Sequence, residues 1–417
     1  MRFATLQQWL SWQESLHPSE IDLGLDRVAE VLRRMQLGEP AFTIISVAGT
    51  NGKGSCVAML DAIYRAAGYR VGVYTSPHIK HYNERIVIAG EEVSDTDLCE
   101  VFEQIDQCRG DISLTYFEFG TLAAIALFQR ANLDVAILEV GLGGRLDAVN
   151  ILDADIALIS SIDLDHQDWL GDTREQIALE KAGIARSHHP VVCGDVDPPE
   201  SILTYLEKLD APLYLINRDY HYARDGQGTW HWRTAQRNRA SLPAPSLRGE
   251  VQLLNASTVL MAVQLLEQQL PVQQTAIRQG LVSTVLPARF QVLPGDIPVI
   301  IDVAHNPQGA RALAATLQQW PCSGATHAVF GVLKDKDVAG IINAMQPVVD
   351  SWYVAGLQVS RAMPVDEVLN TLAQAGNCQS VSSHDSVKMA KDAALSAARA
   401  GDRVVVFGSF YVVSEVL

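Results

Sequence analysis

Several classes of protein are excluded by what the sequence lacks. Its six cysteines are scattered, with no CxxC pair and no zinc-type spacing, so we expect reduced thiols rather than disulfides or a zinc site. They are Cys56, Cys99, Cys108, Cys193, Cys322 and Cys378. No apolar run is long enough to cross a bilayer, and the polar residues within 1–15 are unlike a signal peptide. We therefore expect a cytoplasmic protein that does not span a membrane.

Basic residues are also scarce. Lys and Arg number 32 against 48 Asp and Glu, which gives a net charge of −16 and argues against nucleic acid or an anionic membrane as the main partner. A local cluster of Lys and backbone N–H groups can still bind an anionic substrate. Hydrophobic residues make up 48% of the 417 residues and charged residues 19%. The chain can therefore bury a large core, and its length favours two domains.

Apolar, β-branched runs alternate with helix-like stretches, a pattern typical of strand–helix units on a parallel sheet. The first series predicts strands at 42–49, 70–76, 133–141, 156–163 and 190–195, and helices from Gly54, over 115–130 and over 173–185. A second series predicts strands at 297–305, 326–332, 351–356 and 403–410, with helices at 306–320, 364–376 and 386–401. The fold class is therefore α/β.

The division between two domains is expected at 285–296, where two prolines flank a turn. Residues 1–286 would form a P-loop-type domain with a mostly parallel sheet, and residues 287–417 a smaller, Rossmann-like α/β domain. Within the first domain, residues 218–250 are polar, aromatic and rich in turns, which fits either a small antiparallel sheet or a connecting excursion. Residues 251–284 return to a helical period.

A glycine-rich turn follows the first predicted strand and opens a helix. It reads Gly49-Thr50-Asn51-Gly52-Lys53-Gly54-Ser55. Glycines let backbone N–H groups approach a phosphate, and the helix N-terminus adds positive potential. Lys53 can reach the β- and γ-phosphates, and Ser55 a metal-bound oxygen. Val47 stands where the usual loop has its first glycine, so we interpret this as a variant phosphate loop rather than a turn without a ligand.

Acidic side chains follow two predicted strands at the end where parallel sheets bind ligands. Glu139 ends one strand, and a buried carboxylate is costly unless it is paired or binds a metal. An ion pair with Arg145 is the structural alternative; Mg²⁺, which accompanies ATP, is favoured. Asp163, Asp165 and His166 follow the other strand. Lys181 lies in the helix beyond them, where an exposed, salt-bridged lysine is the alternative.

The loop after the strand at 70–76 is densely polar. Ser76 can offer a hydroxyl to a metal or a phosphate. The residues that follow suit an anionic substrate, and a merely solvated loop is the alternative. They are His78, Lys80, His81, Asn83 and Arg85.

In the second series, Asp302 and His305 end the predicted strand at 297–305. Asp302 can bind a ribose or orient a catalytic group. The structural alternative is helix capping by Asn306 beside a solvated Asp302. Arg289 lies at the expected domain junction, where a guanidinium can reach phosphates.

Ordered motifs along essentially the whole chain resemble the Mur ligase superfamily and, within it, the bacterial family of bifunctional dihydrofolate synthases/folylpolyglutamate synthases. The motifs are LGLDRV, VAGTNGKGS, YTSPH, TYFEF, EVGLGGRLDAVN, DLDHQDWLG, EKAGI, PARF, DVAHNP and FGVLKDKD. One such motif alone is weak, but the ordered set at compatible spacings is highly specific.

The resemblance implies an ATP-dependent amide ligase. ATP would phosphorylate a substrate carboxylate to an acyl phosphate, and the amino group of L-glutamate would then displace phosphate. The implied carboxylates are that of 7,8-dihydropteroate and the γ-carboxylate of reduced folates. The phosphate loop would thus serve the formation of an amide bond.

The resemblance also implies roles for individual residues. ATP would be bound by Thr50, Asn51, Gly52, Lys53, Gly54, Ser55, Asn255, Arg289 and Asp302. Pterin substrates would contact Asp26, Arg27, Val28, Thr115, Tyr116, Phe117, Glu118, Leu146, Asp147 and Ala148. Two Mg²⁺ ions would be held by Ser76, Glu139 and His166. The implied catalytic residues are Lys53, Lys181, Asp302 and His305; a carbamylated Lys181 and a monovalent cation are further candidates.

Three alternatives stay open at this point. The first is a folylpolyglutamate synthase that does not add L-glutamate to 7,8-dihydropteroate, although LGLDRV and TYFEF favour the type that does. A ligase of cell-wall precursors would need an extra N-terminal domain for a UDP-linked substrate, for which residues 1–40 are too short. A P-loop switch would hydrolyse nucleotide without needing glutamate. A monomer is the default expectation.

Overall fold

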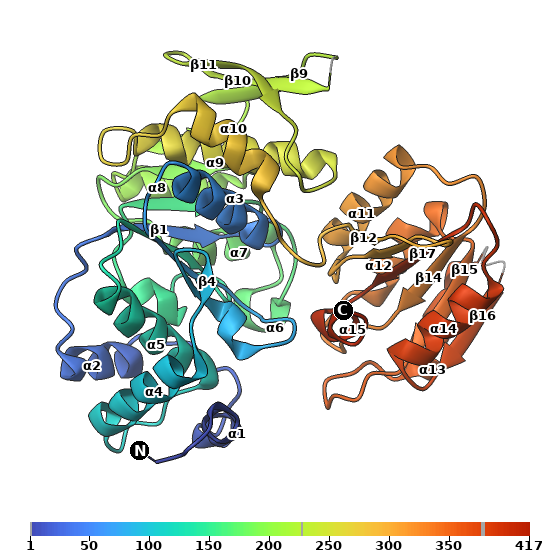
Figure 1. Ribbon diagram of the computed structural model, residues 1–417, viewed down its shortest axis with the longest axis horizontal. Coiled ribbons are helices and arrows are strands. Elements are labelled where there is room, and N and C mark those ends of the chain that lie inside the picture. The colour runs from blue at the N-terminus through green and yellow to red at the C-terminus, as the bar shows by residue number, and fades with distance from the viewer. Residues whose placement is uncertain (1, 227, 377–379) are drawn as a thin grey trace. The chain divides into compact units, whose positions relative to one another are not determined.

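The computed structural model describes residues 2–226, 228–376 and 380–417, and the chain divides into two compact units (Figure 1). The larger comprises Met1–Ser246 and Leu254–Thr284, and the smaller Leu247–Leu253 and Val285–Leu417. Cys378 lies outside the described residues, and the other five cysteines are free of disulfides. No helix in the described ranges is long and apolar enough to span a membrane. The functional roles expected for 1–286 and 287–417 stay predictions.

The larger unit is built on an eight-stranded sheet with the order β4-β3-β2-β5-β1-β6-β7-β8. All its strands run in one direction except β3, which pairs antiparallel with both of its neighbours, β2 and β4, near one edge. The mostly parallel sheet predicted from the alternating pattern is confirmed. Its central strands are buried, which explains why most of their residues are apolar. The bounds are β1 Thr43–Ala48, β2 Val71–Tyr74, β3 Ile86–Ile88, β4 Glu91–Glu92, β5 Val135–Glu139, β6 Ile156–Ile159, β7 Val191–Cys193 and β8 Leu213–Leu215.

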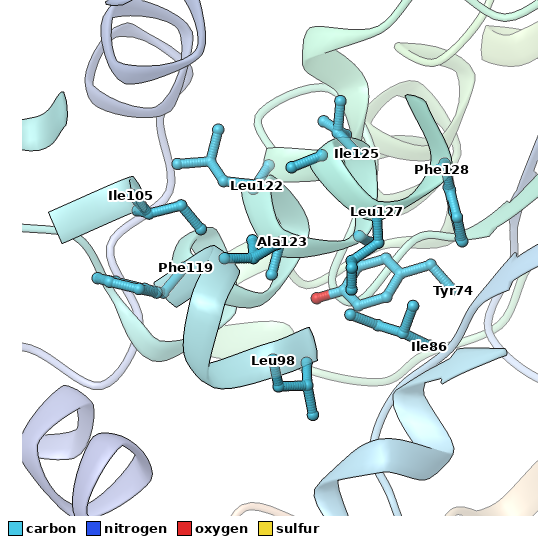
Figure 2. Close-up of a cluster of buried hydrophobic side chains, with 14 of the residues drawn as sticks. Tyr74, Ile86, Leu98, Ile105, Phe119, Leu122, Ala123, Ile125, Leu127 and Phe128 are labelled. Carbon is cyan, nitrogen blue, oxygen red and sulfur yellow. The ribbon is translucent and has the colours of Figure 1, made fainter. Parts of the chain in front are cut away.

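Helices cover both faces of this sheet (Figure 1). Ile44, Ala136 and Leu138 join an apolar cluster with α1, α2, α4 and α5, part of which Figure 2 shows. Helix α3 contacts β1, β2 and β5, and α10 packs against α3. The bounds are α1 Leu6–Leu16, α2 Asp26–Met35, α3 Lys53–Ala66, α4 Asp95–Arg109, α5 Tyr116–Arg130, α6 Gln167–Leu170, α7 Arg174–Ala182, α8 Glu200–Lys208, α9 Glu250–Leu265 and α10 Gln274–Ser283, with 3₁₀ turns η1 Tyr82–Arg85 and η2 Ala148–Ile151.

Residues 218–250 contain a three-stranded antiparallel sheet, which confirms the first of the two alternatives for this segment. Its strands are β9 Tyr220–Arg224, β10 Thr229–Thr234 and β11 Asn238–Pro243. The buried Trp232 donates its Nε1–H to Ser257 O at 3.0 Å, and Tyr220 donates its hydroxyl to Cys193 O at 2.8 Å. These bonds attach the small sheet to α9 and to β7.

The smaller unit has a six-stranded sheet with the order β12-β13-β17-β14-β15-β16, parallel except for β12. One face packs in an apolar cluster with α11, α12 and α13, and α14 contacts β14 and β15. The bounds are β12 Gln291–Leu293, β13 Val299–Ile301, β14 Thr326–Phe330, β15 Ser351–Ala355, β16 Ser380–His384, β17 Arg403–Phe407, α11 Pro307–Gln319, α12 Val338–Met345, α13 Val365–Ala375, α14 Val387–Ala397, α15 Phe410–Ser414 and the 3₁₀ turn η3 Gln346–Val348.

Gly280 sets the distance between α10 and α3. A Cβ atom at this position would lie 2.6 Å from Ile63 Cα and 2.7 Å from Ile63 N. Because backbone atoms cannot move aside as the end of a side chain can, Gly280→Ala should lower the free energy of unfolding by about 1–3 kcal/mol. Urea unfolding followed by circular dichroism measures this, with Gln279→Ala at the exposed neighbouring position as control. Equal midpoints for the wild type and both variants would contradict the close approach.

Candidate active site

The phosphate loop lies at the carboxyl end of β1, the strand between β5 and β6. Helix α3 begins at Lys53, one residue before the predicted start, and Gly52 at its N-cap has φ +91°. Gly49 has φ +149°, and a Cβ atom there would lie 2.0 Å from Ser160 Oγ. Both positions therefore require glycine, for conformation and for space.

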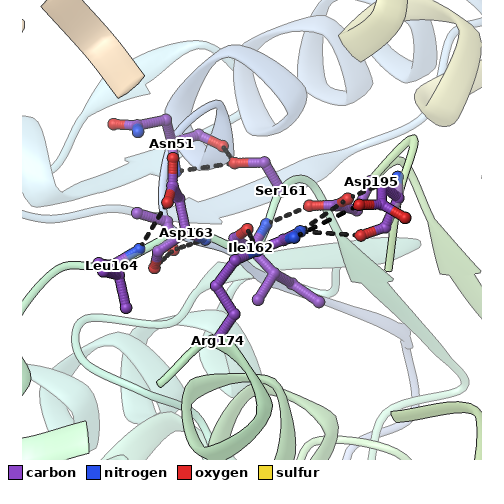
Figure 3. A network of polar contacts seen from close by, with 9 residues as sticks. Asn51, Ser161, Ile162, Asp163, Leu164, Arg174 and Asp195 are labelled. Atoms are coloured by element: carbon purple, nitrogen blue, oxygen red, sulfur yellow. Dashed lines mark hydrogen bonds and ion pairs between the residues drawn. The ribbon is translucent and has the colours of Figure 1, made fainter. Parts of the chain in front are cut away.

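Hydrogen bonds from the segment after β6 fix the loop (Figure 3). Thr50 N donates to Ser161 O at 2.7 Å, Thr50 Oγ1 to Asp163 O at 2.9 Å, and Asp163 N to Thr50 Oγ1 at 3.0 Å. Asn51 O accepts from Ser160 Oγ at 2.7 Å and from Ser161 Oγ at 3.0 Å. The two serines were not among the predicted site residues, because the predicted strand at 156–163 included them, whereas β6 ends at Ile159.

Lys53 and Asn255 complete the surroundings of the loop. Lys53 Nζ donates to Gly49 O at 3.0 Å and to Thr50 O at 3.3 Å. A Cβ atom on Gly52 would lie 2.7 Å from Asn255 Oδ1, and Asn255 is buried on α9. The structure thus brings together the predicted ATP-binding residues of the larger unit, which come from the continuous segment 50–55 and from α9.

Glu139 is the last residue of β5 and is only 6% exposed. Ser76 N donates to Glu139 Oε2 at 3.2 Å, which places these two predicted metal ligands side by side. The proposed alternative, an ion pair with Arg145, is wrong because Arg145 binds Glu180 at 2.8 Å instead. His166, with φ +53°, precedes α6.

The candidate metal ligands are a hydroxyl, a carboxylate and an imidazole. Among the described residues, no group of three or more His, Cys, Asp or Glu side chains could hold a metal ion by itself. A Mg²⁺ ion retains water and phosphate oxygens among its ligands and needs only one or two carboxylates from protein. The buried Glu139 beside Ser76 therefore fits Mg²⁺ carried with a nucleotide better than a site built from protein alone.

Lys181 lies on α7 and is only 4% exposed, so the exposed-lysine alternative is wrong. Burial, followed by the nearby positive charge of Lys53, lowers the pKa of Lys181 to about 7, and Asp165 acts in the opposite direction. The lowered pKa increases the share of the neutral amine near pH 7. The neutral amine is the form that can react with carbon dioxide.

The three predicted substrate segments contact one another although they are far apart in the sequence. They are the starts of α2 and α5 and the turn η2, which begins at Ala148. Arg27 on α2 pairs with Glu118 on α5 at 3.2 Å. Thr115 caps α5 and exchanges hydrogen bonds with Glu118 at 2.7 and 3.2 Å. Gly24 N donates to Leu146 O at 3.2 Å.

Apolar and acidic side chains lie where α2, α5 and η2 contact one another. Val28 and Ala148 are buried, and the ring of Phe117 lies close enough to Gly141 to exclude a Cβ atom there. Asp147 accepts from Leu142 N at 2.8 Å and from Val149 N at 3.0 Å. Burial raises the pKa of Asp147 to about 7, an effect that these hydrogen bonds and Lys53 oppose.

Tyr116 faces the polar loop after β2. Its ring packs edge-on against Tyr82, and the Arg85 guanidinium lies over both rings. Arg85 Nε donates to His78 Nδ1 at 2.8 Å, and burial followed by Arg85 lowers the pKa of His78 to about 4. Glu84 accepts three backbone N–H groups, from residues 79–81, at 2.7 Å each. The loop is therefore held by its own side chains and is not simply solvated.

In the smaller unit, Asp302 directly follows β13. Its carboxylate accepts from Phe290 N and from Ala304 N, each at 2.8 Å, so it is not a solvated side chain. Burial raises the pKa of Asp302, and Arg289 is the largest influence that lowers it. Asn306 caps α11, as the structural alternative predicted.

Arg289 and His305 share one neighbour in this unit. The Arg289 guanidinium lies 5.6 Å from the centre of the Phe410 ring, and the His305 ring lies 6.2 Å from it. His305 Nδ1 lies 2.8 Å from Val303 O. Arg289, which precedes β12, thus lies near Asp302 and His305, which follow β13. Their nucleotide-binding and catalytic roles stay predictions.

The fold and the phosphate loop define the class of protein. Residues 47–255 match the family model of the Mur ligase middle domain, and residues 288–410 that of the Mur ligase, glutamate ligase domain. The chain is 45% identical to dihydrofolate synthase/folylpolyglutamate synthase of Escherichia coli K12, over 99% of this chain and 94% of that protein.

Solved structures agree with this assignment. Escherichia coli FolC in complex with DHPP and ADP superposes with a TM-score of 0.93 at 44% identity, covering 99% of this chain and 97% of that one. A bifunctional folylpolyglutamate synthase/dihydrofolate synthase with Mn, AMPPNP and L-glutamate bound gives 0.90 at 45% identity, covering 99% and 97%. The chain belongs to the dihydrofolate synthase/folylpolyglutamate synthase family of Mur ligases.

The lowered pKa of Lys181 predicts a pH dependence of stability. The folded-state pKa of about 7 lies below the ordinary lysine value of 10.5. Between these pH values the unfolded chain binds one more proton, so the free energy of unfolding should rise by about 1.4 kcal/mol per pH unit and be constant below pH 7. Lys181→Met removes this titration. The difference between wild type and variant in urea unfolding, measured from pH 7 to 10 without carbon dioxide, isolates the slope; a flat difference would contradict the shift.

Proposed function

We propose that the protein is an ATP-dependent acid–amino-acid ligase that adds L-glutamate to 7,8-dihydropteroate and to the γ-carboxylate of reduced folates. The observation that carries the proposal is the phosphate loop, which lies beside the buried Glu139 and Lys181 in a chain 45% identical over almost its whole length to the Escherichia coli enzyme. A related structure that holds AMPPNP and L-glutamate together supports both co-substrates.

The reaction would proceed in two steps. A carboxylate oxygen of the pterin substrate attacks the γ-phosphorus of ATP, and ADP leaves. The amino group of L-glutamate then attacks the acyl carbon, loses a proton, and expels inorganic phosphate. The free energy of the phosphoanhydride is thereby used to form an amide.

Residues of the loop would bind and orient the phosphates. The backbone N–H groups at the start of α3 would donate to the phosphates, and the charge of Lys53 would balance the charge that moves in phosphoryl transfer. Lys53 Nζ donates to the carbonyls of Gly49 and Thr50, which places its charge at the loop that would bind the phosphates. Ser76, Glu139 and His166 would hold Mg²⁺, which neutralises phosphoryl oxygens.

The clustered substrate segments would bind the pterin. Glu118 and Asp147 supply buried acceptors, and Val28, Phe117 and Ala148 supply apolar surface. Such a lining suits a flat heterocycle with donors on one edge and excludes water from a reactive acyl phosphate. A monomeric state, a cytoplasmic location and a monovalent cation stay predictions from the sequence.

The ligase proposal is tested by ADP release from Mg-ATP and L-glutamate with 7,8-dihydropteroate, with tetrahydrofolate, or with no pterin, and by the mass of each product. We expect glutamate-dependent products from both pterins. Lys53→Ala should lower turnover by about 10²–10³-fold or more because it removes a charge that stabilises the transition state. Lys208→Ala, at an exposed position on α8, is the control for charge removal.

The outcomes separate the alternatives. Product from tetrahydrofolate alone would leave only the tail-lengthening activity. ADP release that ignores both pterins and glutamate would replace the ligase with a nucleotide switch. Wild-type turnover by a folded Lys53→Ala variant would contradict the role of the phosphate loop.

We also propose that Lys181 is carbamylated. The ammonium form would first lose a proton, which a pKa near 7 favours, and the neutral amine would then attack carbon dioxide and lose a second proton to give a carbamate anion. Protein equilibrated with ¹³C-bicarbonate should show one carbamate resonance in the ¹³C spectrum that is absent from Lys181→Arg. An active protein without this resonance would contradict the modification.

A further inference from the structure

We propose that Arg174 and Asp195 are positioning residues for the phosphate loop and act through the backbone of Ile162. The inference rests on the function proposed above and extends it to two residues that belong to none of the predicted site segments. Neither side chain bonds to the loop itself. They form an ion pair at 3.3 Å, and the side chain of Asp195 is only 7% exposed.

The ion pair clamps both polar groups of one residue (Figure 3). Asp195 Oδ2 accepts from Ile162 N at 2.6 Å, and Arg174 Nε donates to Ile162 O at 3.0 Å. Arg174 Nη2 also donates to Asp197 O at 2.8 Å, and Asp197 N donates to Asp195 Oδ1 at 2.9 Å. A guanidinium and a carboxylate thus fix the orientation of the chain immediately after β6.

Both neighbours of Ile162 bond to the phosphate loop. Ser161 bonds to Thr50 N and to both backbone groups of Asn51, and Asp163 exchanges two hydrogen bonds with Thr50. Hydrogen bonds weaken steeply when their length or angle departs from the optimum. A rotation of the chain at Ile162 would therefore strain the bonds on both sides of it and loosen the loop.

Arg174 links this clamp to a second element of the site. It is the first residue of α7, the helix that carries the buried Lys181. The same guanidinium thus ties the start of that helix to the segment beneath the phosphate loop. The hydrogen bonds that the clamp supports go to Thr50 and Asn51 of the phosphate loop, so its loss should weaken nucleotide binding more than it alters the chemical step of bound substrates.

The chain offers a matched control on α4. Arg109 pairs with Asp106 at 2.7 Å, with both side chains less than a tenth exposed, and donates to Ile112 O at 3.0 Å. This pair also joins a carboxylate, a guanidinium and a backbone carbonyl, but it lies outside the network that reaches Thr50 and Asn51. A purely structural role for Arg174 would make the two arginines equivalent.

The test is the dissociation constant of Mg-ADP, measured by calorimetry on the full chain, together with KM for ATP and kcat. We expect Arg174→Met and Asp195→Asn to weaken Mg-ADP binding by about 5–30-fold and to raise KM for ATP similarly, with kcat at saturating ATP within about threefold of wild type. Arg109→Met should lower the melting temperature without weakening Mg-ADP binding.

If Arg174→Met does not fold, Arg174→Lys provides a second test of the same contact. Lysine retains the positive charge beside Asp195 but cannot reproduce the planar fork that reaches Ile162 O. Folded variants at position 174 with wild-type affinity for Mg-ADP, or an equal loss of affinity in Arg109→Met, would overturn the inference. A wild-type protein that does not bind Mg-ADP would overturn the proposed function and this inference with it.

Discussion

The parallel pairing of β1 with β5 on one side and β6 on the other is the constraint on which the site depends. The register places Val47 opposite Glu139 and Ala48 opposite Ile159, so all three strands end at the same level. The strand ends therefore bring three features close together: the phosphate loop, the carboxylate of Glu139, and the segment after β6 that carries Ser160 and Ser161. Each strand is buried, so its apolar sequence stabilises the sheet and also fixes the position of the polar residue that follows it.

Burial also gives this site two groups whose charge changes near neutral pH. Desolvation disfavours the charged form of each, so the pKa of Asp147 rises to about 7 and that of Lys181 falls to about 7. Lys53 acts on both in the same sense, lowering each pKa. The charge of Lys53 and the exclusion of water thus both influence the protonation of Asp147 and Lys181. A positive charge and a dry site also favour phosphoryl transfer.

Much of the fold could be predicted because buried parallel strands have sequences rich in apolar and β-branched residues. The strands predicted at 42–49, 133–141 and 326–332 are examples. Strand β16 was missed because its sequence, SVSSH at 380–384, is polar and lies at a sheet edge. The phosphate loop was visible as a local motif. The burial of Lys181 and the clamp of Arg174 and Asp195 were not, because both arise from contacts between segments distant in the sequence.

The central claim is that the phosphate loop serves to activate a carboxylate. It is tested most directly with 7,8-dihydropteroate in which both carboxylate oxygens are ¹⁸O, incubated with Mg-ATP and L-glutamate, by mass analysis of the inorganic phosphate released. An acyl phosphate transfers one substrate oxygen to phosphate, so the account predicts one ¹⁸O per phosphate for each amide formed. Unlabelled phosphate would show that water attacks ATP and would contradict the account.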